Sequence, residues 1–490
     1  MTPAFPLVRK VSGLREREFD LLVVGGGIYG AWCAYDAALR GLRVALVERE
    51  DWAAGTSSAS SKLIHGGLRY LEQFQFSLVH HALTERRILA RIAPHLVRPM
   101  NFIVPVWRGA RVGSFRLSAG LTLYDLLAWK RQPVQRHKHF RRERLRQRYP
   151  FLRAKGLKGG FRYGDCQEDD ARLTLSVVRA AQAAGAVVAN HCAVTDLDDG
   201  TARLHDRHGE QRFALQARHT VLAAGPWVGE LLGEAAPRVK RVKGTHLILP
   251  AIPDCRSAFL LTAPQDGRVF FVIPWYGRTL LGTTESIVDH PDQAVPTDAE
   301  ADYLLAAVNE WMPQLGWGRG DVIGRFAGTR TLQDAGGDNL NSATREFAIL
   351  SPRPGLTVPV GGKFTTARHD ASRVIDVACR VLGVSVKCTT DRHPLPGAPD
   401  GDFVEFLERQ TAALLAAGLD EECANQCALR FGSFTDTLVA MLAENPDWAC
   451  RLAPELPFAR VEQEFARRHE MALTDDDVQR RRVPLAILAP

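Results

Sequence analysis

Several features typical of other protein classes are missing from this sequence. Its nine cysteines are scattered and form no C-x-x-C pair, which argues against a zinc site or a disulfide framework and suits a reducing compartment. No apolar run approaches the roughly 20 residues that span a bilayer. The N-terminal segment is basic but lacks the apolar stretch of a signal peptide. We therefore expect a soluble cytoplasmic protein, or one that lies peripherally on the inner face of the cytoplasmic membrane.

Positive charge is concentrated in one segment. The formal net charge is +7, yet the nine Lys/Arg and one acid between Lys130 and Arg148 sum to +8, so the remainder sums to −1. The stretch Leu117–Trp129 just before it is mostly apolar. An apolar segment followed by a polybasic one is typical of an anchor at an anionic membrane surface. Residues 117–148 are therefore predicted to face such a surface; a solvated basic loop after a buried helix is the alternative. No motif for nucleic acid is present, and no nucleic-acid partner is expected.

The stretch from Phe19 to Glu48 has the order of a dinucleotide-binding unit. An apolar run at 21–24 predicts a strand buried on both faces, and GGGIYG follows it directly. Small residues then predict a closely packed helix, and a second apolar run at 44–47 ends at the acid. A bare G-x-G-x-x-G is weak, but here strand, turn, helix, strand and acid follow in order.

Each part of this unit has a physical role at a cofactor. The first glycine permits a tight turn, the second lets backbone approach a pyrophosphate, and the third allows close packing of helix on strand. The helix N-terminus offers unpaired N–H groups to phosphate, and the acid accepts ribose hydroxyls. The predicted cofactor contacts are Gly25, Gly27, Ile28, Tyr29, Gly30 and Glu48.

A longer and more specific segment comes next. Residues 56–72 read TSSASSKLIHGGLRYLE, whose small hydroxyl residues and glycines let backbone approach a flat ligand. Together with GGGIYG and the later PHLVRPMNFIVPV, this segment resembles the FAD-dependent glycerol-3-phosphate dehydrogenases, of the D-amino-acid-oxidase-like superfamily of flavoproteins. The resemblance recurs at 161–173, 220–227 and 358–366, and extends from residue 19 to about 385.

The resemblance implies an α/β fold with a Rossmann-type FAD-binding domain, an antiparallel-sheet substrate domain and a C-terminal all-helical domain. At 490 residues the chain is long enough for this division. Apolar spacing over 403–415 and 458–471, and acids at 475–477 before bases at 480–482, predict helices in the last part. We divide the chain into an N-terminal extension (1–18), an FAD-dependent oxidoreductase region (19–385) and a helical cap (390–490). Within 19–385 we expect FAD-binding segments at about 19–100, 151–240 and 325–385, and substrate- or membrane-facing segments at about 101–150 and 241–324.

The resemblance also implies further contacts with FAD. Residues 187–194 are predicted as a strand whose end places backbone against the adenine. The helix after Gly362 is expected to point at the pyrimidine edge of the flavin, where its N-terminus stabilises negative charge. The further cofactor residues expected are Thr56, Ser57, Ser61, Lys62, His65, Gly66, Gly67, Ala193, Val194, Ala224, Gly225, Trp227, Gly362, Lys363, Phe364 and Thr365.

The reaction of the family is oxidation of sn-glycerol 3-phosphate to dihydroxyacetone phosphate. Hydride passes from C2 to flavin N5, and the electrons go on to a quinone. This chemistry needs a base for the hydroxyl proton and a grip on the phosphate, for which arginine is suited. By resemblance, the substrate-binding residues are Arg69, Tyr70, Arg330 and Arg345, and the catalytic residues are His246 as base, Arg330, and Lys363 near the flavin or the substrate.

Three positions near the expected substrate site depart from the usual family pattern. Thr331 follows Arg330 where the family usually has Pro-Leu, Ala367 replaces a Tyr, and Glu285 replaces an Asp. An FAD oxidoreductase of another phosphorylated polyol or modified glycerol phosphate is therefore the nearest alternative. A non-catalytic FAD-binding protein at a membrane is the more distant one, and amine or amino-acid oxidation is disfavoured by the 56–72 match.

No second G-x-G-x-x-G follows a strand, so a nicotinamide partner is unsupported, and no metal cluster is expected. Electrons can leave to a quinone, a protein carrier or oxygen, and the membrane-facing segment favours quinone. The helical cap carries no recognised chemistry; contact with partners or with a second copy, as in a homodimer, stays open.

Overall fold

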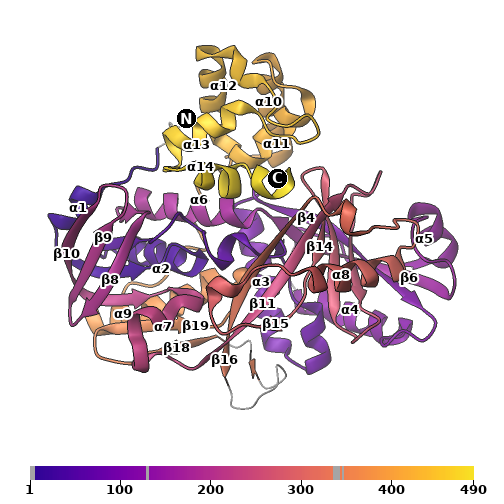
Figure 1. Ribbon diagram of the computed structural model, residues 1–490, viewed down its shortest axis with the longest axis horizontal. Coiled ribbons are helices and arrows are strands. Elements are labelled where there is room, and N and C mark those ends of the chain that lie inside the picture. Colours follow the sequence, from indigo (N-terminus) through magenta and orange to yellow (C-terminus); the bar gives the residue numbers. More distant parts are fainter. Residues whose placement is uncertain (1–5, 129–131, 335–342, 345–346, 490) are drawn as a thin grey trace.

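A largely parallel sheet forms one half of the molecule in the computed structural model, which describes residues 6–128, 132–334, 343–344 and 347–489 (Figure 1). The strand order is β18-β19-β10-β1-β2-β7; the edge pair β18/β19 is antiparallel and the other neighbours are parallel. Helix α2 packs between α6 and α9. The elements of this half are α1 (Val11–Arg15), β1 (Phe19–Val24), α2 (Ile28–Leu39), β2 (Val44–Val47), α6 (Asp170–Ala183), β7 (Val187–Ala189), β8 (Cys192–Asp198), β9 (Thr201–Asp206), β10 (Gln211–Leu222), α7 (Val228–Leu232), β18 (Ala348–Leu350), β19 (Leu356–Val360) and α9 (Ala367–Leu382).

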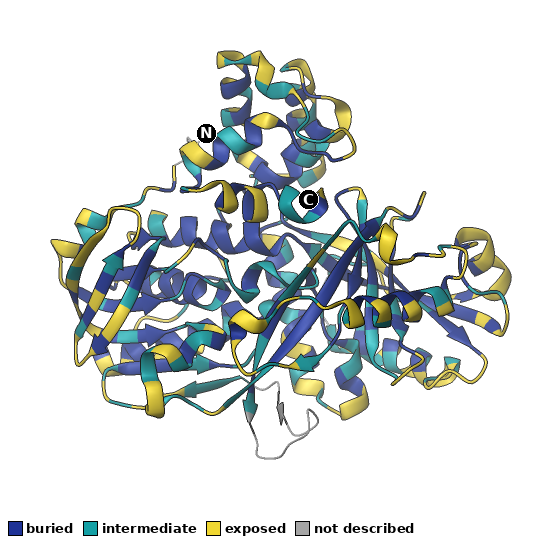
Figure 2. Ribbon diagram, in the orientation of Figure 1, coloured by how far each residue is buried: buried dark blue, intermediate teal, exposed yellow. Residues whose placement is uncertain are grey.

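Strand β1 shows why the strands of this half are continuous apolar runs in the sequence. Leu21 and Val23 belong to the core beneath α2, α6 and α9, whereas Leu22 and Val24 belong to the core on the opposite face. Because side chains alternate between faces, a strand covered on both sides must be apolar at every position. Figure 2 shows these central strands buried. The predicted doubly covered strand is confirmed.

The second half is a mostly antiparallel sheet in the order β17-β16-β11-β14-β13-β12-β4-β6-β3, with β15 beside β11 and β5 beside β6. Strands β12 and β4 pair in parallel. This arrangement confirms the predicted antiparallel-sheet domain. Its elements are β3 (Leu63–Ile64), α3 (Phe76–Ile92), β4 (Val97–Trp107), α4 (Ser114–Ala128), β5 (Lys138–Arg141), α5 (Arg142–Arg148), β6 (Leu157–Glu168), β11 (Val239–Pro250), β12 (Ala258–Thr262), β13 (Val269–Trp275), β14 (Arg278–Gly282), β15 (Ser286–Ile287), α8 (Asp298–Trp311), β16 (Gly324–Asp334) and β17 (Ala343–Thr344).

The C-terminal segment forms a helical domain that packs on both halves of the molecule, at the top of Figure 1. Buried side chains from α10 to α13 form their own core, as predicted for a helical cap. Asp402 and Asp420 accept backbone N–H groups at the starts of two helices, which are standard N-cap positions. Its elements are α10 (Phe403–Ala416), α11 (Glu421–Phe431), α12 (Thr435–Glu444), α13 (Arg460–His469), α14 (Asp475–Asp477) and α15 (Leu485–Leu488).

Two predicted elements differ in detail. The strand predicted over 187–194 is interrupted at His191, whose φ of 48° turns the chain from parallel β7 into antiparallel β8. The helix predicted after Thr474 is one α-helical turn followed by a π-helical turn over Val478–Arg482. Pro484 lacks the N–H that would continue a helix. None of the helices within the described ranges has the length and apolar character needed to cross a membrane.

Candidate active site

A cavity of about 860 Å³ lies between the two sheets. The carboxyl ends of β1, β2 and β10 contribute Val24, Glu48 and Ala224, and the antiparallel sheet contributes His246 and Arg330. The edge formed by the carboxyl ends of parallel strands is the usual ligand site of such sheets. The volume of the cavity suits a large organic cofactor.

The glycine-rich turn begins this cavity. Gly25 has a φ of 110°, and its N–H donates to Val47 O at 2.8 Å. A side chain on Gly30 would place its Cβ 1.8 Å from Gly25 O, so helix and turn touch without room for a methyl group. The N–H of Ile28 donates to Ser57 Oγ at 2.9 Å. Helix α2 therefore presents its positive end to the cavity.

Glu48 closes β2 at the same edge. Its Oε2 accepts the N–H of Gly26 at 2.6 Å, and its Oε1 accepts the N–H of Glu50 at 2.9 Å. Burial raises the pKa of Glu48, and the two backbone N–H groups oppose that rise. A carboxylate has about four acceptor positions, so two such bonds leave capacity for the vicinal hydroxyls of a ribose.

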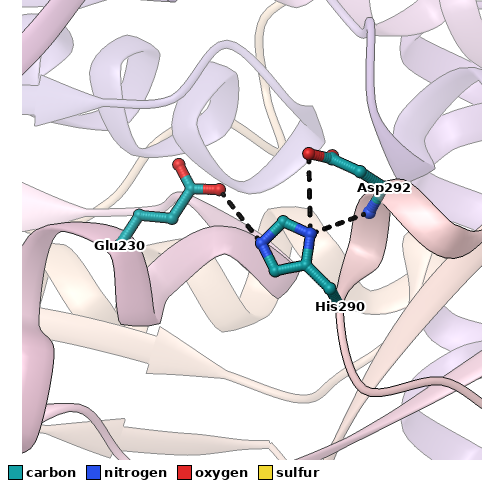
Figure 3. A group of neighbouring side chains, drawn as sticks. All are labelled: Glu230, His290 and Asp292. Atoms are coloured by element: carbon teal, nitrogen blue, oxygen red, sulfur yellow. Dashed lines mark hydrogen bonds and ion pairs between the residues drawn. The ribbon is translucent and has the colours of Figure 1, made fainter.

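An aromatic and charged clasp joins the two halves at the rim of the cavity. Trp227 Nε1 donates to Asp292 Oδ1 at 2.9 Å, and the Arg49 guanidinium lies 5.0 Å from the Trp227 ring centroid and 2.6 Å from Glu230. Figure 3 shows His290 between the two carboxylates, with Nε2 3.6 Å from Glu230 and Nδ1 3.5 Å from Asp292. These three exposed groups lie close enough together to be considered for a metal ion. The carboxylates, however, face opposite ring nitrogens, and Nδ1 already accepts the N–H of Asp292 at 3.3 Å, so the three side chains do not converge on one point as metal ligands do.

The substrate end is built on one face of the β11/β16 pair. In the register Val242 faces Arg330, Gly244 faces Gly328, and His246 faces Phe326. Residues two apart on a strand share a face, so the arginine and the histidine flank a hollow at Gly244. Gly328 beside it is covered by Ala59, whose Cβ would lie 2.8 Å from a Cβ on that glycine. A Cβ on Gly244 would lie 2.5 Å from Arg330 Nη2. The guanidinium thus rests where a side chain is missing.

Arg330 already has acidic and hydroxyl neighbours in this hollow. Its Nη1 donates to Glu285 Oε1 at 2.9 Å and its Nη2 to Thr283 Oγ1 at 3.3 Å. The side chains of Arg330 and Glu285 are 29% and 18% exposed, so the pair is reachable from the cavity. Such a guanidinium can meet an incoming phosphate with charge-assisted hydrogen bonds.

His246 is buried and neutral at ordinary pH. Its Nε2 shares a 2.9 Å hydrogen bond with Ser61 Oγ, its ring stacks on Phe326 at 4.9 Å, and its Nδ1 has no hydrogen-bond partner among the described residues. Burial, followed by the charges of Arg330 and Lys62, lowers the pKa of His246 to about 3. The imidazole is therefore in the form that can accept a proton, although its low pKa makes it a weak base.

The turn before α9 completes the site. Gly362 has a φ of 83°, and a Cβ there would lie 1.9 Å from Tyr29 Oη. The N–H of Lys363 donates to that hydroxyl at 3.0 Å, and Lys363 Nζ lies 3.5 Å from the ring centroid of Tyr70. Tyr29 in turn donates to Asp370 at 2.8 Å, which ties the turn to α2 and α9.

The cavity gathers most of the residues proposed from the sequence. Those that line it are Gly25, Gly27, Ile28, Tyr29, Glu48, Thr56, Ser57, Ser61, His65, Gly67, Arg69, Tyr70, Val194, Ala224, Gly225, Trp227, His246, Arg330, Gly362, Lys363, Phe364 and Thr365.

Four proposed cofactor residues lie behind the lining instead. Gly30 packs on the glycine-rich turn, Gly66 packs on Leu83, and Ala193 is buried in β8. Lys62 points away from the cavity and pairs with Asp170, with its Nζ 2.7 Å from the carboxylate. Arg345, proposed for substrate, lies outside the described residues, as do 129–131 of the basic segment and 335–342.

Other lining residues were not proposed from the sequence. Glu285 is a departure from the family pattern rather than a predicted site residue, and Thr283 is not predicted at all, although their place just after β14 is a usable signal. Many further lining residues come from strands or loops whose local pattern carries no chemistry. Examples are Arg49, Cys192, Arg207, Leu260, Val269 and Phe271.

Comparison with known proteins decides the family. Residues 20–366 match the family model described as FAD dependent oxidoreductase, and residues 388–490 match that of the C-terminal domain of alpha-glycerophosphate oxidase. The chain is 34% identical to the glycerol-3-phosphate dehydrogenase of Synechocystis sp., over 98% of this chain and 91% of that one. It is also 34% identical to the aerobic glycerol-3-phosphate dehydrogenase of Bacillus subtilis, over 96% and 87%. The chain belongs to the FAD-dependent glycerol-3-phosphate dehydrogenase family.

A solved structure of this family has the same fold. The glycerol-3-phosphate dehydrogenase of Bacillus halodurans, complexed with FAD, superposes with a TM-score of 0.79 at 29% identity, over 98% of this chain and 88% of that one. FAD is accordingly the cofactor of this family member. The cavity fits FAD, because it is lined by the glycine-rich turn, by Glu48 and by the turn at Lys363.

Proposed function

We propose that the chain oxidises sn-glycerol 3-phosphate to dihydroxyacetone phosphate and passes the electrons to a quinone. The observation that carries this proposal is the hollow on β11/β16, where a guanidinium and a neutral imidazole flank Gly244 at the wall of the flavin cavity. A phosphate grip and a proton acceptor on one face are what oxidation of a phosphorylated secondary alcohol needs.

In this mechanism each residue has one task. FAD, when bound, supplies the acceptor for the hydride that leaves C2. Arg330 holds the substrate phosphate with charge-assisted hydrogen bonds, and Arg69 and Tyr70 line the same cavity. His246 accepts the hydroxyl proton. Lys363, beside Tyr70, supplies positive charge where the reduced cofactor carries extra electrons.

Two of the cofactor contacts predicted from the sequence are assigned to parts of FAD in this proposal. Glu48 receives the ribose hydroxyls, and the α2 N-terminus receives the pyrophosphate. Buried Lys62 acts indirectly: its Nζ lies 2.6 Å from Ser58 O and 2.7 Å from Asp170 Oδ1, which holds the serine-rich loop in place. The loop then crosses β16, where Thr56 Oγ1 donates to Thr329 O at 2.6 Å.

We also propose that the protein docks peripherally on an anionic membrane. Most apolar residues of the predicted 117–129 stretch, such as Leu117 and Leu121, are in the core. The apolar side chains that face outward are Phe74 and Phe115, which are 78% and 87% exposed, with Phe76 and Leu126 beside them on the packed α3/α4 pair. Aromatic side chains at this exposure, followed in the chain by the basic strand β5 and helix α5, suit an interfacial contact.

A second substrate class has its own supporting observation. The carboxylate of Glu285 forms an ion pair with the Arg330 guanidinium at 2.9 Å, and Thr331 and Ala367 differ from the residues that are usual in the family. A differently substituted polyol phosphate is the candidate, because Glu285 and Thr331 line the cavity together with Arg330, whereas Ala367 is fully buried in the core and is not part of the cavity wall.

Anaerobic reduction of the bound flavin tests the two substrate proposals. The purified holoprotein is mixed with sn-glycerol 3-phosphate, and the flavin absorbance near roughly 450 nm is followed. Rapid bleaching supports the main proposal. Bleaching by another polyol phosphate, but not by glycerol 3-phosphate, favours the second substrate class. A flavin that no phosphorylated polyol reduces refutes both and supports a non-catalytic FAD-binding protein.

A further inference from the structure

The helical domain contacts the cofactor half through a buried carboxylate. Asp51 is fully buried, three residues after Glu48. It accepts Arg482 Nη1 at 2.7 Å and Arg482 Nη2 at 3.0 Å, Arg481 Nε at 2.6 Å, and Asn190 Nδ2 at 3.1 Å. Both arginines belong to the π-helical turn near the C-terminus, 430 and 431 positions away in the chain.

The loop that carries Asp51 also forms the ribose end of the cavity. Ala53 N–H donates to Gly26 O at 3.0 Å, and a Cβ on Gly26 would lie 2.5 Å from the Trp52 ring, so Trp52 fills the space behind the glycine-rich turn. The next residues of the loop, 54–57, line the cavity. Asp51 therefore lies in the backbone between two sets of cavity-lining residues, Glu48 before it and 54–57 after it, and a contact that fixes Asp51 also restrains both.

Further buried polar contacts fasten the same joint. Arg172 Nη2 pairs with Glu470 Oε1 at 2.9 Å, and Arg482 Nη2 also donates to Glu470 O at 2.9 Å. His191, at the break between β7 and β8, pairs with Asp477 at 3.0 Å, and that ion pair raises the pKa of His191. Buried ion pairs contribute little net stability because desolvating the charges is costly, but they require one geometry.

We propose that Arg482, with Arg481, is a positioning residue for FAD: the helical domain clamps loop 48–57 so that Glu48 and the α2 N-terminus meet the AMP half of the cofactor. This inference rests on the proposed placement of the ribose at Glu48. It assigns a role to a domain whose sequence carries no chemistry of its own. The clamp acts through Asp51 and touches neither flavin nor substrate.

The test compares two buried arginines of the helical domain in the full-length protein. Arg482→Met removes the bidentate partner of Asp51 but keeps a long side chain. Arg430→Met is the matched control, because Arg430 is equally buried and pairs with Glu462 at 2.7 Å inside the helical domain. FAD and ADP affinities are measured by titration of the FAD-free protein, and backbone amide exchange is measured over residues 48–57.

The proposal expects a selective effect. Arg482→Met weakens FAD at least about tenfold, equivalent to about 1.4 kcal/mol, and weakens ADP by a similar factor, because both ligands share the AMP half. Exchange over 48–57 becomes faster. Arg430→Met lowers thermal stability while FAD affinity and exchange over 48–57 stay at wild-type values. Arg481→Met, which removes one donor and leaves the bidentate pair, gives a smaller change in the same direction and serves if Arg482→Met does not fold.

Three results would overturn the proposal. One is wild-type FAD affinity and loop exchange in a folded Arg482 or Arg481 variant. Another is equal weakening of FAD by Arg430→Met, which would indicate general destabilisation. The third result separates the Arg482–Asp51 contact from the placement of the ribose. If Glu48→Gln binds FAD normally while Arg482→Met still speeds amide exchange over 48–57, the contact restrains the loop. Its proposed role in positioning FAD through Glu48 is then wrong.

Discussion

Replacing Arg330 by Met should separate phosphate binding from every other function of the site. A hydrogen bond to a charged group contributes about 1.5–3 kcal/mol. Two such bonds from one guanidinium to a phosphate would give about 3–6 kcal/mol, or a loss of roughly 10²–10⁴-fold in kcat/KM. Arg330 donates to Glu285 in this structure and must exchange that partner for phosphate. The expected loss therefore lies toward the lower end, at about 100-fold.

The assay is single-turnover flavin reduction by glycerol 3-phosphate and by glycerol, with inorganic phosphate as a competing ligand. The Arg330→Met variant should retain its flavin, lose most reduction by glycerol 3-phosphate, and no longer be inhibited by phosphate. Reduction by glycerol, which has no phosphate, should be unaffected. Arg325→Met is the control, since Arg325 lies on the same strand in an exposed pair with Asp298 at 2.7 Å.

Glu285→Gln provides the reciprocal test. Removing a negative charge that faces the incoming phosphate, while keeping a side chain of the same shape, should tighten glycerol 3-phosphate binding by about threefold to tenfold, since surface-accessible charge pairs are worth about 1 kcal/mol.

The reasoning is refuted if Arg330→Met slows both substrates equally. It is equally refuted if phosphate still inhibits that variant with wild-type affinity.

Three further predictions follow from packing, burial and exposure. Gly30→Ala should cost about 1–3 kcal/mol of stability and release flavin, because its methyl group would overlap Gly25 O; Gly120→Ala, at an open helical site, should instead stabilise by about 0.5–1 kcal/mol. Equal melting temperatures and flavin contents in the two variants would contradict this. Burial lowers the pKa of both His95 and His246 to about 3. The unfolded chain therefore takes up protons below about pH 6.5 that the folded chain refuses, and the free energy of unfolding should fall by up to about 1.4 kcal/mol per pH unit for each histidine. Denaturant titrations between pH 6.5 and roughly 4 test this, and a slope unchanged in His95→Gln would contradict it. Phe115→Ser should weaken binding to anionic vesicles without altering flavin reduction by glycerol 3-phosphate, and sedimentation with vesicles at wild-type levels would remove that surface from consideration.

Much of the fold was predictable because its signals are local. An apolar run, a glycine-rich turn and a closing acid are each set by neighbours a few residues away, and the strands, turn and helix occur where they were expected. The resemblance of residues 56–72 to a known family carried the identity of the cofactor, which the family matches confirm.

Other features depend on contacts that no local pattern reveals. Lys62 was expected at the cofactor, but Asp170, 108 residues further along, holds its ammonium group away from the cavity. Glu285 differs from the usual family residue by one methylene, and only the pairing of strands places its carboxylate on Arg330.

The sequence by itself determined which helices and strands form and which cofactor they bind. The reason is that backbone conformation, and the pattern of buried and exposed positions along each element, are encoded by residues close together in the chain. Tertiary structure alone decided which charges far apart in the sequence neutralise one another. The partner of Asp51 lies 431 positions away in the helical domain. Since a buried charge must find its counterion wherever the fold brings one within about 3 Å, such pairs are read from coordinates and not from spacing.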